Sequence, residues 1–303
     1  MNPQRTTLSV PGHLAKMHAK ALASKADVIM LDLEDSVPAD QKEAAREQVV
    51  KSLGTLDVSQ RHVLVRINSV DTPFAFRDIL ALGALEGIAG LVIPKVAHER
   101  DIYFIRGLLD GLHMEGGRGT MDLQACIETP EGLERVSRIV EAGEGVLTAL
   151  AFGIADYSAA VGSGLPSLSG HGENEGELYP GHRWHFPLSR MVMVAKAHGL
   201  LALDAPFGNF KNFEGLKKSA LWGAALGCDG KWVIHPDQIG TVNEIFTPSK
   251  EEISRARTIL KVADSAMNQG RGAVAVEGKM VDQATIRMAQ RIRQTAEHLG
   301  LEF

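Results

Sequence analysis

Short apolar runs rich in β-branched residues recur along the chain and alternate with amphipathic stretches. Each run is bounded by turn-forming residues and is followed by a pattern of helical spacing, so the runs predict strands and the stretches between them predict helices. Continuous apolar strands that alternate with amphipathic helices indicate a parallel sheet covered by helices. The predicted strands are Thr7–Pro11, Val28–Glu34, Val63–Asn68, Gly90–Val96, Leu123–Glu128, Leu147–Gly153, Leu200–Ala205 and Lys231–His235.

The predicted helices include Ala39–Leu53, Asp71–Leu82 and Pro130–Ala142, and Asp40 and Thr129 occupy positions that favour N-caps. Eight strand–helix units fit a closed (β/α)8 TIM barrel better than an open, doubly wound sheet. The open sheet would carry a glycine-rich phosphate loop after its first strand, whereas here the segment PGHLAKM holds a single glycine.

Two segments fall outside this repeat. The long polar stretch Ser158–Trp184 is rich in glycine, and loops of this length in compact domains usually carry function. We therefore expect a TIM barrel catalytic domain over residues 1–247 and a C-terminal helical extension or lid over residues 248–303. The pattern of this extension predicts two helices with a glycine hinge between them, in the order Pro248–Met267, Gly270 with Gly272, and Asp282–Leu299.

Composition limits the partners and the cellular locations that we expect for the protein. The 303 residues hold 32 Lys and Arg against 37 Asp and Glu, a net charge of −5, so no basic patch supports nucleic-acid binding. No apolar run of about 18 residues predicts a membrane span, and the N-terminal segment lacks the apolar core of a signal peptide. Two cysteines, Cys126 and Cys228, are too few for a disulfide framework and favour a reducing, cytoplasmic location.

Ionisable residues stand at the carboxyl ends of successive predicted strands, which is where barrel enzymes carry their catalytic groups. Isolated charges there are usually only solvated, but a ring of acidic and basic residues together indicates an active site. The members of this ring are Glu34, Asp35, Arg66, Lys95, Glu128, Asp156, Asp204 and His235.

Glu128 and Asp156 are the predicted metal ligands. Each follows an apolar strand, so rigid backbone would carry its carboxylate. Two carboxylates completed by water and substrate oxygens are typical of Mg²⁺. Zn²⁺ would recruit His or Cys, and no tight cluster of these residues occurs in the sequence. For Cys126, two residues before Glu128, core packing is the better interpretation.

The remaining ring members have two interpretations each. Arg66 suits a carboxylate or a developing oxyanion, and it also suits an ion pair with Glu34 or Asp35. Lys95 would form a Schiff base if it were desolvated, or remain a structural charge beside the carboxylates. His235 would orient groups and shuttle protons, or form a hydrogen-bonded corner before Pro236.

Seven segments, in order along the chain, carry a family resemblance: LDLEDSVPADQKEAAR, VRINS, IPKV, IETPEG, AFGIADYS, GLLALDAPFGNF and GKWVIHPDQI. Together they resemble the citrate lyase β-subunit-like group of the HpcH/HpaI aldolase family. The resemblance covers about Arg5 to Met288 and is strongest to the malyl-CoA and β-methylmalyl-CoA lyases, although DAPFGNF departs slightly from their DGPFGDF.

The resemblance implies a Mg²⁺-dependent lyase, with Mn²⁺ as a substitute, that assembles as a homotrimer or homohexamer. Such an enzyme cleaves a 3-hydroxy-3-carboxyacyl-CoA, such as malyl-CoA, β-methylmalyl-CoA or citramalyl-CoA, into a 2-keto acid and an acyl-CoA. Carried over by motif, Glu128 and Asp156 bind the metal and Arg66 contacts the keto-acid oxygen. Glu34 and Asp35 hold metal-bound waters or the arginine.

The resemblance also suggests residues that would complete the site. The motif EGKMVD places on Asp282 the role of a proton-transferring carboxylate on a flap from a neighbouring subunit. Arg5 would lie near the acyl-CoA at the barrel mouth, and Lys95, Asp204 and His235 are further substrate-binding candidates.

Other functions remain open from the sequence. The same metal site would serve a malyl-CoA thioesterase, a citrate lyase subunit acting on a carrier protein, or a pyruvate aldolase that does not use CoA. A barrel retained only for binding would show no metal affinity at Glu128 and Asp156.

Overall fold

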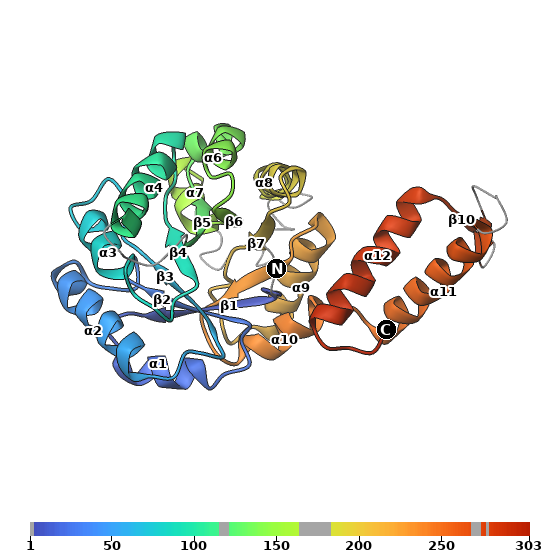
Figure 1. The fold of residues 1–303 in the computed structure, drawn as a ribbon, viewed down its shortest axis with the longest axis horizontal. Coiled ribbons are helices and arrows are strands. Elements are labelled where there is room, and N and C mark those ends of the chain that lie inside the picture. Colours follow the sequence, from blue (N-terminus) through green and yellow to red (C-terminus); the bar gives the residue numbers. More distant parts are fainter. Residues whose placement is uncertain (1–2, 115–120, 164–182, 268–273, 277–278) are drawn as a thin grey trace. The chain divides into compact units, whose positions relative to one another are not determined.

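Eight parallel strands close into a barrel, which confirms the predicted fold (Figure 1). The computed structural model describes residues 3–114, 121–163, 183–267, 274–276 and 279–303. Each strand pairs with its neighbour in sequence, and β1 pairs with β8 to close the ring. The strands are β1 (Thr6–Pro11), β2 (Val28–Asp32), β3 (His62–Arg66), β4 (Gly90–Ile93), β5 (Asp122–Ile127), β6 (Leu147–Phe152), β7 (Leu201–Asp204) and β8 (Gly230–Val233).

Helices surround this barrel on its outer side (Figure 1). They follow the strands in the alternation that the hydrophobic pattern predicts. Their bounds are α1 (Ala15–Leu22), the 3₁₀ turn η1 (Ala39–Gln41), α2 (Lys42–Thr55), α3 (Ala75–Leu82), α4 (Glu99–Met114), α5 (Pro130–Glu134), α6 (Val136–Ala142), α7 (Ile154–Ala160), α8 (His185–Ala197), α9 (Phe213–Leu226) and α10 (Gln238–Ile245).

One of the two predicted helix caps is confirmed. Thr129 accepts a hydrogen bond from the amide of Gly132 (3.0 Å) and Pro130 opens α5. The prediction that Asp40 caps the next helix is wrong, because residues 39–41 form a 3₁₀ turn and Gln41 takes the N-cap position of α2.

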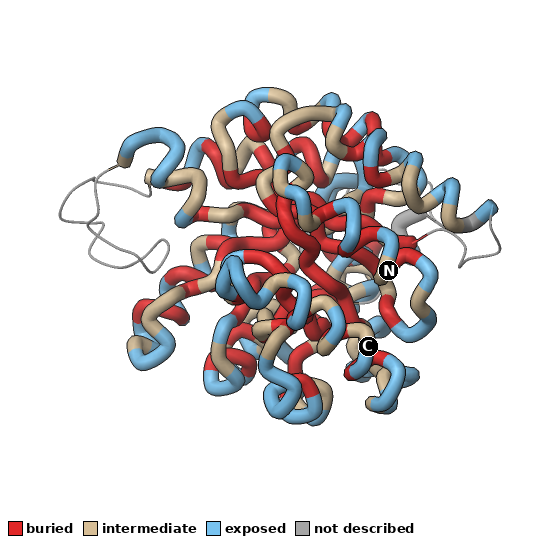
Figure 2. Tube along the Cα trace, turned by 90° about the vertical axis from the view of Figure 1, so that its left-hand side faces the viewer, coloured by how far each residue is buried: buried red, intermediate tan, exposed pale blue. Residues whose placement is uncertain are grey.

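Side chains alternate between the barrel lumen and the surrounding helices. The buried lumen cluster comprises Val28, Met30, Leu64, Val92, Cys126, Ala149, Ala151, Leu203 and Trp232. Cys126 therefore packs in the core, as predicted. Figure 2 shows the buried residues gathered along the central strands, with exposed residues on the outer turns. Side chains two positions apart on a strand share a face. Asp32, Arg66 and Glu128 each stand two residues after a lumen residue, so they lie on the lumen side at the carboxyl ends of their strands.

The chain divides into two compact units, residues 4–243 and residues 244–303 together with 1–3. In the second unit two long helices pack against each other, and a short antiparallel hairpin that the sequence did not predict lies between them in the chain. The predicted boundary after residue 247 falls between α10 and α11, and the predicted hinge glycines 270 and 272 lie outside the described residues. The elements are α11 (Lys250–Met267), β9 (Val274–Val276), β10 (Lys279–Val281) and α12 (Gln283–His298).

Most of the predicted functional loop, residues 164–182, also lies outside the described residues. Within the described ranges, no helix combines the length and apolar character that crossing a bilayer requires.

A buried ion pair joins β7 to β8. The Lys231 ammonium lies 2.6 Å from Asp204 Oδ2, and neither side chain is exposed. The neighbouring residues Leu203 and Trp232 face the lumen, so Asp204 faces the helices, and it lies against Gly223 of α9. The prediction that Asp204 binds substrate is therefore wrong, because a shift of one residue along a strand moves a side chain to the opposite face.

We expect Lys231→Met to lower the free energy of unfolding by about 3–5 kcal/mol, because it leaves the Asp204 carboxylate buried without its partner. The measurement is chemical denaturation followed by circular dichroism. Arg77→Met breaks an ion pair whose two side chains are 60% and 59% exposed, and it should cost at most about 1 kcal/mol. Equal losses in the two variants would contradict a stabilising role for the buried pair.

Candidate active site

One wall of the barrel mouth is an arginine held by a buried aspartate. Asp32 and Arg66 lie opposite each other in the pairing of β2 with β3. Arg66 donates from Nε to Asp32 Oδ1 and from Nη2 to Oδ2, both at 2.7 Å. Asp32 also accepts the amides of Glu34 (2.9 Å) and Ser36 (3.1 Å). The guanidinium is thus fixed by a planar two-bond fork, which a lysine cannot form.

Burial acts to raise the pKa of Asp32, but the Arg66 charge and the hydrogen bonds outweigh it and hold that pKa below its ordinary value. Asp32 therefore stays ionised. Sequence reasoning missed this residue because it looked only at strand ends. The signal was present in the two-residue alternation, since Asp32 follows Met30 on the lumen face.

Glu34 links this arginine to Lys95. One Glu34 oxygen lies 3.0 Å from Arg66 Nη1, and the other accepts a 2.5 Å hydrogen bond from Lys95 Nζ. The ammonium also lies 3.1 Å from Asp35 Oδ1 and 3.6 Å from Asp156 Oδ1. Both interpretations of Arg66 are thus compatible, because the ion pair with Glu34 holds the guanidinium at the barrel mouth.

Burial acts to lower the pKa of Lys95, but its hydrogen bond to Glu34 and the surrounding carboxylates outweigh burial and raise that pKa. A Schiff-base lysine needs a neutral amine, so this environment opposes the imine interpretation. Lys95 is a permanent cation in the site.

The opposite wall carries the predicted metal ligands. Glu128, which follows β5, is 3% exposed and accepts the Lys95 amide at 2.7 Å. Burial, together with the charges of Glu34 and Asp156, raises the pKa of Glu128 to about 7. Asp156 lies in the first turn of α7 with its side chain 37% exposed. Arg66, Glu128, Asp156 and Asp35 line one pocket, so the structure brings these four predicted residues together.

Gly153 makes room for Glu128. A Cβ at this position would lie 2.1 Å from Glu128 Oε2 and 2.4 Å from its Cβ. The next strand therefore has to offer a glycine here for the carboxylate to point into the pocket.

The donor set fits Mg²⁺. Within the described residues no three His, Cys, Asp or Glu side chains converge in a metal-binding group, so Glu128 and Asp156 would leave the other positions to water and substrate oxygens. Around the pocket, five carboxylates face three cationic side chains, and the charges of Glu34 and Asp156 add to burial in raising the pKa of Glu128. The carboxylates are Asp32, Glu34, Asp35, Glu128 and Asp156, and the cations are Lys42, Arg66 and Lys95.

Arg5 lies at the wrong end of the barrel for the predicted contact with acyl-CoA. It precedes β1, and its guanidinium donates to Asp27, which precedes β2, at 2.8 and 2.7 Å. Both residues stand at the amino ends of their strands, whereas the pocket lies at the carboxyl ends. The prediction for Arg5 is therefore corrected: it is a structural ion pair.

His235 follows β8 at the carboxyl end of the barrel. Its ring stacks on Phe210 with 4.9 Å between the centroids, and its Nδ1 lies 3.4 Å from Asp237. The side chain is 39% exposed. This is the hydrogen-bonded corner that the sequence allowed, and a role in substrate binding stays a prediction.

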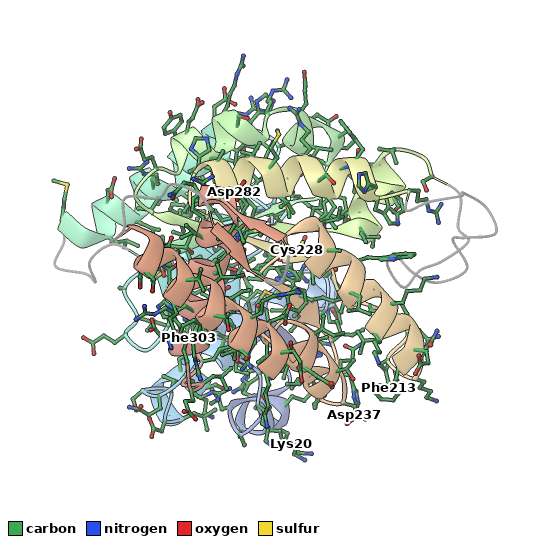
Figure 3. The ribbon with its side chains drawn as sticks, turned by 90° about the vertical axis from the view of Figure 1, so that its right-hand side faces the viewer. Lys20, Phe213, Cys228, Asp237, Asp282 and Phe303 are labelled. Carbon is green, nitrogen blue, oxygen red and sulfur yellow. The ribbon has the colours of Figure 1, made fainter. Side chains whose placement is uncertain are left out.

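Asp282 belongs to the second unit, where it caps α12 (Figure 3). Its Oδ1 accepts hydrogen bonds from the amide (2.8 Å) and the hydroxyl (2.9 Å) of Thr285. The hydrogen bond from the backbone N–H of Thr285, followed by that from its hydroxyl, lowers the pKa of Asp282. Its predicted part in proton transfer stays a prediction.

Comparison with known proteins places the chain among carbon–carbon lyases. The family model described as HpcH/HpaI aldolase/citrate lyase matches residues 5–236, and a model described as a C–C bond lyase of the TIM-barrel fold matches residues 189–301. An L-malyl-CoA/β-methylmalyl-CoA lyase from Cereibacter sphaeroides is 37% identical over 306 residues, covering 98% of this chain and 96% of that protein. The citrate lyase subunit beta of Leuconostoc mesenteroides is 31% identical, covering 97% and 93%.

Among solved structures, CitE from Mycobacterium tuberculosis, crystallised with magnesium, acetoacetate and coenzyme A, superposes with a TM-score of 0.78. It is 30% identical, and the match covers 97% of this chain and 98% of that one.

We expect Gly153→Ala to displace the Glu128 carboxylate and to abolish the rise in melting temperature that Mg²⁺ would produce. Gly107→Ala in α4 is the matched control, because a Cβ there meets nothing within 4 Å. It should stabilise the helix by up to about 1 kcal/mol and leave the Mg²⁺ effect intact. An unchanged Mg²⁺ response in Gly153→Ala would show that Glu128 does not need this space.

Proposed function

Since the chain belongs to the HpcH/HpaI aldolase/citrate lyase family, we propose that it is a Mg²⁺-dependent carbon–carbon lyase acting on 3-hydroxyacyl-CoA thioesters. One observation carries the proposal. The pocket at the carboxyl ends of the strands holds a fixed guanidinium, Arg66, together with two acidic side chains, Glu128 and Asp156, suited to a hard cation.

The proposed substrate class is a 3-hydroxy-3-carboxyacyl-CoA: malyl-CoA, β-methylmalyl-CoA or citramalyl-CoA. Support comes from the names of the lyases that match nearly the whole chain. The products would be a 2-keto acid and an acyl-CoA. Mg²⁺, or Mn²⁺ in its place, would supply Lewis acidity toward the oxygens of the keto acid when bound by Glu128 and Asp156.

Arg66 would stabilise the oxygen on which charge develops. Two of its N–H groups donate to Asp32, and Nη1 forms an ion pair with Glu34, so the guanidinium keeps further N–H groups for a substrate oxygen in the pocket. Because the fork is fixed before substrate arrives, little reorganisation is needed in the transition state. Asp35, 53% exposed at the rim, would hold water or turn toward the substrate.

The reaction needs two proton transfers. In the cleavage direction the substrate hydroxyl loses its proton, the C2–C3 bond breaks, and its electron pair passes to the α-carbon of the thioester, which then takes up a proton. We assign the second transfer to the Asp282 carboxyl of a neighbouring subunit within a homotrimer or homohexamer. Covering the pocket would shield that carboxyl from water and raise its pKa toward the value that carbon protonation requires.

The state of the two cysteines supports the cytoplasmic location that we propose from the sequence. Cys126 and Cys228 are both unpaired and buried, which is consistent with a cytoplasmic location.

The experiment that tests this function is a substrate panel with the three CoA thioesters, assayed with Mg²⁺ for both 2-keto acid and free CoA. We expect a stoichiometric 2-keto acid and acyl-CoA, and no activity in Glu128→Ala. Release of free CoA with an intact hydroxy acid would identify a thioesterase instead. Turnover of the carrier-protein thioester alone would identify a citrate lyase subunit, and aldol turnover without CoA a pyruvate aldolase. Metal-independent cleavage by Glu128→Ala would contradict the proposed chemistry.

We expect Arg66→Lys to lower kcat by about 10²–10³-fold, because an ammonium can replace neither the fork to Asp32 nor the paired donors to the substrate oxygen. Steady-state kinetics on the best substrate of the panel provides the measurement. Arg77→Lys, an exposed residue on α3, makes the same chemical change away from the pocket and should leave kcat unchanged. A rise in KM alone, with kcat preserved, would show that Arg66 binds the substrate but does not act in the chemical step.

A further inference from the structure

The backbone of Lys95 adopts a conformation that side chains rarely take. Its φ is 50°, and among the described residues no other non-glycine residue has a positive φ. Such strain persists only where the surrounding structure holds it in place, and it concentrates at functional sites. At Lys95 the backbone amide donates to Glu128 on one wall of the pocket, and the side-chain ammonium donates to Glu34 on the other.

The main chain and the side chain of Lys95 contact the two proposed metal ligands. Its amide donates to Glu128 Oε1 at 2.7 Å, and its ammonium lies 3.6 Å from Asp156 Oδ1. The ammonium is anchored more tightly to Glu34, at 2.5 Å, than to Asp156. The strained turn thus aims a permanent positive charge at the carboxylates that a divalent cation would need.

We infer that the Lys95 ammonium is a built-in counter-ion that competes with the divalent cation for Asp156 and so sets the metal affinity of this chain. The inference rests on the proposed metal pair. In the metal-free protein the ammonium neutralises part of the acidic cluster. When the cation binds, Lys95 withdraws from Asp156 and stays on Glu34.

The distances explain why the exchange would occur at Asp156 and not elsewhere. A gap of 3.6 Å is an ion pair without a hydrogen bond, whereas the ammonium is hydrogen-bonded to Glu34 at 2.5 Å and to Asp35 at 3.1 Å. Asp156 is also half-exposed, so water can replace the ammonium there at little cost. Glu128 keeps its hydrogen bond from the Lys95 amide with and without the cation, because a backbone N–H carries no net charge that would repel the cation.

Lys42 provides a matched comparison. Its ammonium lies near Asp32, Glu34 and Asp35, but it donates to the carbonyls of Leu33 (2.9 Å) and Glu34 (2.6 Å) and forms no ion pair with Asp156. A general effect of removing one positive charge would appear equally in Lys42 and Lys95 variants. Competition for Asp156 would appear only in Lys95 variants.

The test is calorimetric titration of the metal-free full chain with Mg²⁺ at fixed ionic strength and at pH 8. We expect Lys95→Met to bind Mg²⁺ about tenfold more tightly than the unaltered chain, and Lys42→Met to differ by less than about threefold. Met keeps the length of the side chain and meets the same backbone constraint at φ 50°. Lys95→Arg keeps the charge and should restore the weaker affinity.

Two further measurements locate the competition. In an Asp156→Asn background, Lys95→Met should no longer tighten Mg²⁺ binding, because the contested carboxylate is gone. Thermal unfolding with and without Mg²⁺ should show a larger metal-induced rise in Tm for Lys95→Met than for the unaltered chain, because the metal-free state has lost its counter-ion. Lys95→Gln provides the same comparisons if the Met variant does not fold.

Equal affinity in Lys95→Met and the unaltered chain, weaker binding in Lys95→Met, or equal tightening by Lys42→Met would each overturn the inference. These outcomes leave the proposed function standing as long as the unaltered chain binds Mg²⁺ and Glu128→Ala does not. Absence of Mg²⁺ binding in the unaltered chain would overturn both.

Discussion

The two-residue alternation of side chains along the barrel strands is the constraint on which the site depends. Apolar residues fill the lumen, and the next position on the same face of three strands carries Asp32, Arg66 and Glu128. The packing that closes the barrel therefore also sets the direction of the functional groups. Asp204 shows the converse: it ends its strand in the same way, but it stands on the other face and pairs with Lys231 under α9.

The pocket concentrates more negative charge than its own cations balance. Buried carboxylates without a counter-charge are costly, and the protein meets that cost in different ways on the two walls. On one wall Asp32 and Glu34 pair with Arg66 and Lys95, which fixes the geometry, although burial still raises the pKa of Glu34. On the other wall Glu128 forms no ion pair with a described residue and accepts the Lys95 amide; burial raises its pKa to about 7, and a divalent cation would favour the ionised carboxylate. Ion pairs therefore fix the wall that carries Arg66, whereas the wall that carries Glu128 has negative charge that the proposed cation would neutralise.

Hydrophobic periodicity was sufficient to predict the fold, because eight mainly apolar runs alternate with amphipathic stretches and a closed parallel barrel is a compact way to bury such runs. The position of Glu128, Asp156 and Arg66 at one end followed from the same topology. The roles of Arg5 and Asp32 were not predicted correctly, because they depend on details that the topology does not determine. The placement of Arg5 was carried over from a resemblance, although it precedes its strand and lies at the opposite end. Asp32 was missed because it lies inside a predicted strand, and its role depends on the register with Arg66.

The bonding inside the pocket bears on where the proton-transferring group comes from. Of the carboxylates that the structure describes there, Asp32 accepts four hydrogen bonds, two of them from the fork that holds Arg66, and Glu34 is shared by Arg66 and Lys95, so a proton on either would weaken a contact that fixes the cations. Glu128 and Asp156 cannot bind a cation and carry a proton at once. Asp35 is left at the exposed rim, where water would compete for the carbanion. If the proposed lyase chemistry holds, the carboxylates of the barrel are all engaged in this way, and this is the physical reason to propose an acid from the C-terminal unit of another copy of the chain.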